Sequence, residues 1–346
     1  MNARNLILAS VLLGLIASLA FTDLKKDSSG ALMTASATAF LATLDDDERA
    51  IAQLEFDTPK RVDWHFIPKD KRKGLVIREM NEEQRAAAHK LLQTSLSELG
   101  YTKATKIMQL EEVLAQLEGD EDRKRRDELK YYFTIFGKPA GDGRWGLSVE
   151  GHHLSFNYVV DNGKVAASSP QFMAANPTVV AKTYEKTPRM KKGKEVLAAE
   201  KKLAFAFLNA LNEDQQAKAI IAEKAPREIR AAGEPHPPRE KPAGIAVSDL
   251  TEAQKETLEK LVDEYIGAMP ADVAAGRRKE IETADINKIH FAWAGATKPG
   301  IGHYYRIEGP TFLIEFVNTQ PDAAGNPASH IHCVWRDPRG DFGISP

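Results

Sequence analysis

Two blocks of the chain recur in the same order, each with helix-start signals followed by strand-rich segments. The first block pairs residues 74–84 with residues 244–254, and both begin at a glycine and end in a helix-capping string. The second block aligns residues 133–159 with residues 291–317 without a gap, including a Glu-Gly pair in each copy. Identities are few, but two matching blocks in one order favour an internal duplication. The sequence therefore predicts two related halves, and residues that differ between them are candidates for function.

Four short strings indicate where helices begin. In each, Asp, Asn or Thr precedes Glu or Gln by three positions, which is the pattern of a capping box; the pairs are Asp45/Glu48, Asn81/Gln84, Asn212/Gln215 and Thr251/Gln254. These strings resemble functional motifs, but their spacing is typical of helix starts. Together with apolar periodicity, they predict helices over residues 31–56 (broken near 44–45), 82–98, 103–118, 190–211, 213–223, 252–268 and 271–282.

Strand signals follow the helices in both halves. They predict strands over residues 131–136, 144–150, 152–160, 288–293, 302–308, 311–317 and 329–336, with a hairpin turn at 161–163 into a further strand. Helices preceding antiparallel strands, twice over, indicate an α+β fold. The predicted divisions are a first half (21–224), a proline-rich linker (225–243) and a second half (244–346). The halves either share one sheet or pack as two domains.

The linker and the N-terminus differ in composition from the rest of the chain. Residues 225–244 contain five prolines and no apolar periodicity, which predicts an exposed, mobile segment. Arg4 precedes an apolar run over residues 6–20 that ends in small residues. This pattern predicts a signal peptide cleaved before Phe21, and hence export to the periplasm, the cell surface or the medium. An uncleaved anchor is the alternative, and no other segment could cross a membrane.

Overall charge makes nucleic acid a poor candidate partner. The 346 residues include 47 Lys plus Arg and 49 Asp plus Glu, for a net charge of −2. No basic stripe with interleaved aromatics is present, and the charge run at 69–73 mixes signs as a solvated loop does. Cys333 is the only cysteine, and a small buried hydrophobic residue is its favoured interpretation over a metal ligand.

The histidines carry the sharpest functional signal. His330 and His332 lie two apart on a predicted strand, so both imidazoles face the same side and could bind one metal ion. His153 is the third candidate ligand, because its neighbours on one strand face are polar. His152 should point to the opposite side unless a bulge intervenes. A pair of surface or hydrogen-bonded histidines is the alternative to a metal site.

Other polar residues are candidates for the same site. Glu315 lies inside an apolar strand, where a carboxylate needs a cation, a metal or several donors. It could pair structurally with Arg306 or Arg336, or act as a ligand or general base. Glu315 and Arg306 are the candidate catalytic residues, and His152, His303 and Arg336 are secondary candidates. His303 aligns with Trp145, so an aromatic-sized core position is its alternative role.

Three strings resemble one known family. They are residues 145–157 (WGLSVEGHHLSFN), 304–310 (YYRIEGP) and 330–343 (HIHCVWRDPRGDFG). Together they resemble the domain-of-unknown-function family DUF3500, over roughly residues 30–346. The resemblance implies an exported bacterial protein and one family-length unit. It implies no activity.

Two hypotheses for function follow. The first is an exported metal-dependent enzyme, with zinc or copper favoured and hydrolysis as the default reaction, since neutral imidazoles suit those ions. The second is a non-catalytic module that binds a small molecule or a cell-wall polymer through aromatic residues and Arg306, with hydrogen-bonded histidines. Signatures of nucleotide cofactors, nucleophile elbows and metalloprotease helices are absent from the sequence.

Overall fold

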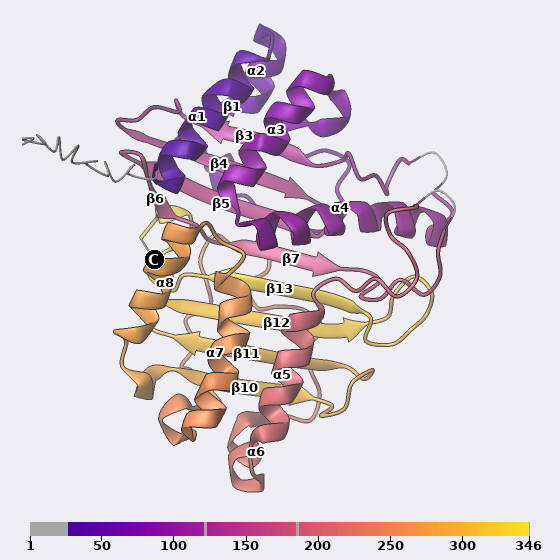
Figure 1. The fold of residues 1–346 in the computed structure, drawn as a ribbon, viewed down its shortest axis with the longest axis vertical. Coiled ribbons are helices and arrows are strands. Elements are labelled where there is room, and N and C mark those ends of the chain that lie inside the picture. Colours follow the sequence, from indigo (N-terminus) through magenta and orange to yellow (C-terminus); the bar gives the residue numbers. More distant parts are fainter. Residues whose placement is uncertain (1–26, 121–122, 185–186, 346) are drawn as a thin grey trace, which may run out of the picture.

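One mixed β-sheet runs through the whole molecule in the computed structural model (Figure 1). The structure describes residues 27–120, 123–184 and 187–345, so the predicted signal peptide lies outside the described residues. Within these ranges the sheet has 13 strands. They are β1 (Gln53–Leu54), β2 (Leu75–Val76), β3 (Tyr132–Phe136), β4 (Arg144–Gly151), β5 (Leu154–Asp161), β6 (Lys164–Ala167), β7 (Gln171–Ala175), β8 (Ile220–Ala222), β9 (Ile245–Ala246), β10 (His290–Gly295), β11 (His303–Gly309), β12 (Phe312–Gln320) and β13 (His330–Arg336).

The strand order shows how the two halves meet. Along the sheet it reads β1-β3-β4-β5-β7-β13-β12-β11-β10-β8, with β2 on β3, β6 on β5 and β9 on β10. β7 and β13 pair antiparallel at the centre, so the halves share one continuous sheet. Each outer strand, β1 or β8, pairs parallel with its neighbour. This order is compatible with the predicted duplication, which stays a prediction.

Helices cover one face of the sheet (Figure 1). They are α1 (Ser29–Ala42), α2 (Asp46–Ala52), α3 (Glu82–Ser95), α4 (Glu98–Glu118), α5 (Ala198–Ala210), α6 (Glu213–Ala219), α7 (Glu252–Ile266) and α8 (Ala271–Glu282). All four predicted capping boxes are present, with both reciprocal hydrogen bonds in each. The α+β class is therefore confirmed, and local capping signals set the starts of four helices.

Several predicted boundaries were wrong for local reasons. The helix predicted from residue 190 begins at Ala198, because Leu197 before it has a left-handed backbone with φ of 57°. Residues after Ala52 pair into β1 instead of continuing the helix. β7 was not predicted, since its sequence QFMAA has neither alternation nor β-branched residues, although all five residues are buried.

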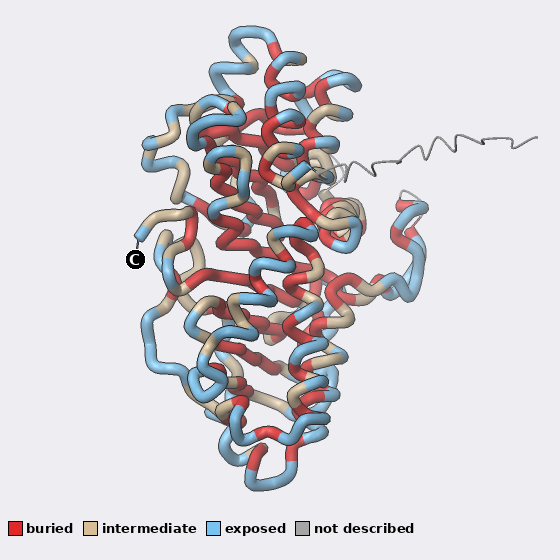
Figure 2. The backbone as a smooth tube through the Cα atoms, turned by 60° about the vertical axis from the view of Figure 1, so that its left-hand side comes forward, coloured by how far each residue is buried: buried red, intermediate tan, exposed pale blue. Residues whose placement is uncertain are grey.

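Irregular segments cover the other face of the sheet. Trp64, Phe66, Ile229 and Phe342 form a cluster there with apolar strand residues, including Val317. The proline-rich linker was predicted to be exposed, but Ile229 is 3% exposed and the Trp64 indole donates to a linker carbonyl. Figure 2 shows the buried strands as a column through the molecule with exposed backbone around it. The linker packs here because the sheet is apolar on both faces.

The helices before the linker pack on the second half of the sheet. α5 contacts α7, and β8 pairs with β10, although residues 198–222 precede the linker. α5 and β8 therefore lie with the second half of the sheet, and the sequence division at 224 stays a prediction. In the described part of the chain, none of the helices is long and apolar enough to span a bilayer.

Candidate metal centre

A tight turn between β4 and β5 presents two adjacent histidines. Gly151 pairs with Leu154, so His152 and His153 are the turn residues between them. His153 has a left-handed φ of 67°, and a Cβ on Gly151 would lie 2.1 Å from the Tyr131 ring. The predicted strand at 152–160 therefore begins later, and its alternation rule does not apply to the two histidines. Their rings stack instead, with centroids 3.6 Å apart.

β13 brings His330 and His332 to the same place. Both side chains lie on the sheet face away from the helices, and His332 pairs in register with Ala174 of β7. The Ala174 amide donates to the His153 carbonyl at 2.9 Å, and the His153 amide donates to the Phe66 carbonyl at 3.0 Å. These backbone bonds hold the turn against the central strands. The structure thus brings together the three histidines that the sequence singled out as ligands.

Three imidazole nitrogens converge in this cluster. His330 Nε2 lies 2.9 Å from His153 Nε2 and 2.9 Å from His332 Nε2. One nitrogen from each histidine lies within 4.8 Å of the others. Tetrahedral ligands at the usual zinc–nitrogen distance are separated by about 3.3 Å. The three nitrogens could therefore hold a metal ion after small side-chain shifts.

Glu228 determines the tautomer of His332. Both of its carboxylate oxygens lie 2.8 Å from His332 Nδ1, so Nδ1 carries the proton and donates it. The lone pair of His332 Nε2 then points into the cluster. Carboxylate–histidine pairs of this kind orient metal-ligating imidazoles in many proteins.

The neutral cluster cannot satisfy both of its close nitrogen contacts. His332 Nε2 has no proton, so the contact with His330 requires a proton on His330 Nε2. That proton cannot serve the contact with His153 at the same time. If His330 Nε2 carries a lone pair instead, it faces the lone pair of His332 at 2.9 Å. A cation bound here would remove this conflict, because it would accept all three lone pairs.

Asn176 is placed to orient His330 for metal binding. Its side-chain amide lies 3.4 Å from His330 Nδ1, and its Oδ1 is buried without a partner in the described residues. Exchanging the amide oxygen and nitrogen, which are isosteric, would let Oδ1 accept a proton from Nδ1. The lone pair of His330 Nε2 would then point into the cluster, as coordination requires.

Burial keeps His153 and His330 neutral. Burial lowers the pKa of His153 well below its usual range, and it lowers the pKa of His330 to about 3. Neighbouring imidazoles and the Arg126 guanidinium lower both pKa values further. Neutral imidazole is the form that binds metal ions. His153 and His330 therefore offer ligand lone pairs across the physiological pH range.

Comparison with known families identifies the chain but not its activity. A family model described as "Protein of unknown function (DUF3500)" matches residues 26–344. The chain belongs to the DUF3500 family. The resemblance inferred from three sequence strings is thus confirmed over nearly the whole chain. Searches of curated proteins and of solved structures gave no match.

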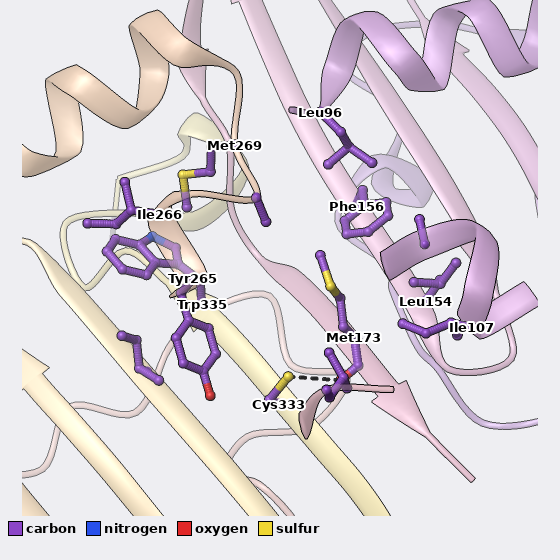
Figure 3. Close-up of a cluster of buried hydrophobic side chains, with 14 of the residues drawn as sticks. Leu96, Ile107, Leu154, Phe156, Met173, Tyr265, Ile266, Met269, Cys333 and Trp335 are labelled. Atoms are coloured by element: carbon purple, nitrogen blue, oxygen red, sulfur yellow. Dashed lines mark hydrogen bonds between the residues drawn. The ribbon is translucent and has the colours of Figure 1, made fainter. Parts of the chain in front are cut away.

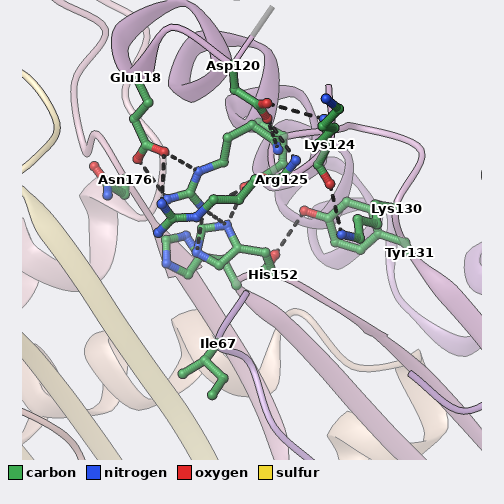
Figure 4. A network of polar contacts seen from close by, with 12 residues as sticks. Ile67, Glu118, Asp120, Lys124, Arg125, Lys130, Tyr131, His152 and Asn176 are labelled. Carbon is green, nitrogen blue, oxygen red and sulfur yellow. Dashed lines mark hydrogen bonds and ion pairs between the residues drawn. The ribbon is translucent and has the colours of Figure 1, made fainter. Parts of the chain in front are cut away.

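A second group of potential ligands in this DUF3500 protein is already satisfied. Glu111 Oε1 lies 2.5 Å from His152 Nδ1, and Arg126 lies 3.2 Å from His152 Nε2. When Glu111 is ionised, Nδ1 can donate to its carboxylate while Nε2 accepts from the guanidinium; when Glu111 is protonated, it donates to Nδ1 instead. Figure 4 shows this network, in which the Tyr131 hydroxyl also donates to the His152 carbonyl. Because Arg126 supplies the positive charge, these residues fit a structural network better than a second metal.

Burial also shifts the acid–base behaviour of this network. It raises the pKa of Glu111 to about 8, against the opposing effect of Arg126. It lowers the pKa of His152 well below its usual range, and Arg126 contributes to that shift. His152, a secondary candidate, therefore lies beside the three-histidine cluster as a stacked and hydrogen-bonded neighbour.

The candidate catalytic residues lie outside the histidine cluster. Glu315 is fully buried, but its partners are Arg230 of the linker, at 3.1 Å, and the Tyr304 hydroxyl, at 2.7 Å. The sequence had suggested Arg306 or Arg336 for this pairing. Arg306 instead pairs with Glu308 at 2.9 Å. Glu315 thus has a structural ion pair, as one of the sequence interpretations expected, but its partner is Arg230.

Arg336 and His303, the other secondary candidates, have structural surroundings. Arg336 is fully buried, pairs with Asp341 at 2.6 Å and donates to two linker carbonyls. His303 stacks on Trp293 with centroids 5.5 Å apart and also contacts Phe205 of α5, so it lies on the helix-covered face. The sheet separates it from the metal centre. This position matches the alternative drawn from the sequence, in which His303 fills a core position of aromatic size.

Cys333 is not part of the centre. On β13 it points to the helix-covered face, opposite to its neighbours His332 and Val334. It is buried, and its thiol donates to the Met173 carbonyl at 3.3 Å (Figure 3). Burial raises the pKa of this thiol well above its usual range. The favoured interpretation of Cys333 as a small buried hydrophobic residue therefore fits its surroundings.

Sequence reasoning missed four residues around the histidines. Glu228 and Asn176 orient ligands, and Glu111 and Arg126 surround His152. All four come from a linker, a loop or a helix far away in the sequence. Only Glu111 carried a local signal, as an acidic residue on the buried face of α4.

Proposed function

We propose that this protein is an exported metal-dependent enzyme whose ion is held by His153, His330 and His332. The observation that carries the proposal is the convergence of three Nε2 atoms whose close contacts cannot all be hydrogen bonds. Three neutral imidazoles with a carboxylate behind one of them suit zinc or copper. The absence of Cys333 from the ligand set is consistent with either ion.

Hydrolysis is the reaction that we assign by default. A metal ion with three protein ligands and an open position supplies Lewis acidity and acidifies a bound water. The protein's own contribution is orientation. Glu228 holds the Nδ1 proton of His332, and the β13 backbone keeps His330 and His332 on one side. Phe66 and Phe172, which stack 3.7 Å apart, form an apolar wall that limits water around His332.

Metal analysis of the purified mature protein tests the proposal. We expect near-stoichiometric zinc or copper in the wild type, and little in the folded variant His330→Ala plus His332→Ala. His236→Ala is the matched control, because His236 is exposed in the linker. If the wild type stays metal-free after reconstitution with each ion, the proposal is wrong. The histidines would then belong to a non-catalytic binding module, the alternative drawn from the sequence.

Secretion is a separate part of the proposal. It is supported by the charged start, apolar run and small residues of the N-terminal segment. N-terminal sequencing of the protein from the periplasm or the medium should find a chain that begins at Phe21. A chain that is retained in the cytoplasm with an intact N-terminus would contradict this part.

A further inference from the structure

A hollow of about 280 Å³ lies next to the loop that covers the metal centre. Its lining comes from residues 60–73 and from β4, and it consists entirely of charged side chains: Lys60, Asp63, Lys69, Lys71, Arg72, Lys73 and Glu150. We call it the cationic hollow, because five of these side chains are positive and two are negative. The excess is local, since the whole chain has a net charge of −2.

Only part of this positive charge is neutralised by the protein. Glu150 pairs with Lys73 at 2.7 Å and with Arg72 at 3.9 Å. In the described part of the chain, Lys69 and Lys71 form neither an ion pair nor a hydrogen bond, and the same holds for Lys60. The hollow therefore keeps several cations available for an anionic ligand. The Asp63 carboxylate repels such a ligand, but the cationic side chains in the lining are more numerous than the acidic ones.

Arg72 is a buried and fixed cation in the lining, which distinguishes the hollow from a chance group of surface lysines. Its side chain is 3% exposed, and its guanidinium donates to the carbonyls of His65 and Ile67. Two of its five N–H groups are thereby used, which leaves three on a guanidinium that lines the hollow. Arginine is the residue that most often binds phosphate or sulfate oxygens in pairs.

The hollow extends towards the histidines. Lys69 and Arg72 also line a second, smaller hollow, which reaches Glu111 and His152. The same covering loop contacts the metal centre directly. The Phe66 carbonyl accepts from the His153 amide, and the Phe66 ring meets the edge of His332 with centroids 5.0 Å apart. An anion bound in the cationic hollow would thus lie on the loop that covers the ligands.

We propose that the cationic hollow is an oxyanion-binding subsite, which holds a phosphate or sulfate group of the substrate beside the metal centre. That this anion is part of a substrate rests on the proposed function. The binding of the anion itself does not. The inference narrows the substrate class to phosphorylated or sulfated molecules.

Calorimetric titration of the full mature chain, stripped of metal, tests the subsite. Inorganic phosphate, inorganic sulfate and a sugar phosphate are the probes, each at low and high salt. We expect Lys69→Ala plus Lys71→Ala to weaken binding by roughly tenfold or more, because two charge-assisted contacts are lost. High salt should weaken binding in the wild type by screening.

A matched variant distinguishes binding at the cationic hollow from a general effect of the protein's positive charge. Lys260→Ala plus Lys279→Ala removes the same charge from exposed positions on α7 and α8, across the sheet. It should bind all probes as the wild type does. Equal losses in both double variants, or no binding to the wild type, would overturn the subsite. Binding of inorganic ions but not of the sugar phosphate would overturn its assignment to a substrate.

The outcome is independent of the metal proposal. Because the titration uses metal-free protein, a failed metal analysis leaves the anion result intact. Conversely, the Lys69 and Lys71 variant should keep the wild-type metal content, since neither lysine contacts His153, His330 or His332.

Discussion

His332 donates its Nδ1 proton to Glu228, which lies 104 residues earlier in the chain. Glu228 belongs to the proline-rich linker, and the next residues of that linker are tied to β12 by Arg230 and Glu315. The linker is therefore a structural part of the histidine cluster. Within the linker, Ile229 and Pro237 are buried, whereas the other residues are half-buried or exposed.

Replacing Glu228 tests this link. Glu228→Gln keeps the shape of the side chain but removes the charge that holds the Nδ1 proton of His332. We expect metal affinity to fall about 10–100-fold, the usual effect of losing a carboxylate behind a metal-ligating histidine. Competition with a chromophoric chelator measures it. Glu223→Gln, an exposed change nearby in the sequence, is the control, and equal affinities in both variants would contradict the role of Glu228.

The largely buried imidazole of His330 should make the metal-free protein sensitive to acid. Its folded-state pKa of about 3 lies below the value near 6.5 of an unfolded histidine. The unfolded chain therefore binds more protons in this window, and stability falls as the pH drops from about 6.5 towards about 3.

The size of this effect can be isolated by mutation. His330→Gln should reduce the loss of unfolding free energy between pH 7 and pH 4 by about 1–3 kcal/mol, after allowance for partial exposure. Urea unfolding at both pH values measures it. His236→Gln should show the wild-type pH dependence. An unchanged slope in His330→Gln would mean that His330 is not buried in its neutral form.

The sequence predicted the local features of this site better than its assembly. His330 and His332 share a face because strand geometry requires it, and the capping boxes fixed helix starts because their bonds are local. His153 was selected for a wrong reason, since it lies in a turn and not on a polar strand face. Glu228 and Asn176 could not be predicted, because their places depend on how the linker and the chain after β7 cross the sheet.

The left-handed turn at His153 offers a way to separate ligation from stability. His153→Gly and His153→Ala both remove the imidazole, so both should lose the metal. Glycine adopts the φ of 67° without strain, whereas alanine pays roughly 1–2 kcal/mol there. Thermal unfolding of the metal-free variants should therefore rank His153→Gly as the more stable. Equal stability would show that the turn has relaxed, and metal retained by either variant would remove His153 from the ligand set.

Arg230 should be essential for stability because it neutralises Glu315. Glu315 is fully buried, and the guanidinium of Arg230 bonds to it and to Glu308. Arg230→Met leaves the carboxylate with the Tyr304 hydroxyl and the backbone amide of residue 230 but without a positive charge, and we expect a loss of about 3–5 kcal/mol in unfolding free energy. Adding Glu315→Gln removes the unpaired charge and should recover much of that loss in urea unfolding. If Arg230→Met is as stable as the wild type, Glu315 is not held by this ion pair. If the second change brings no recovery, the loss comes from displacement of the linker instead of the buried charge.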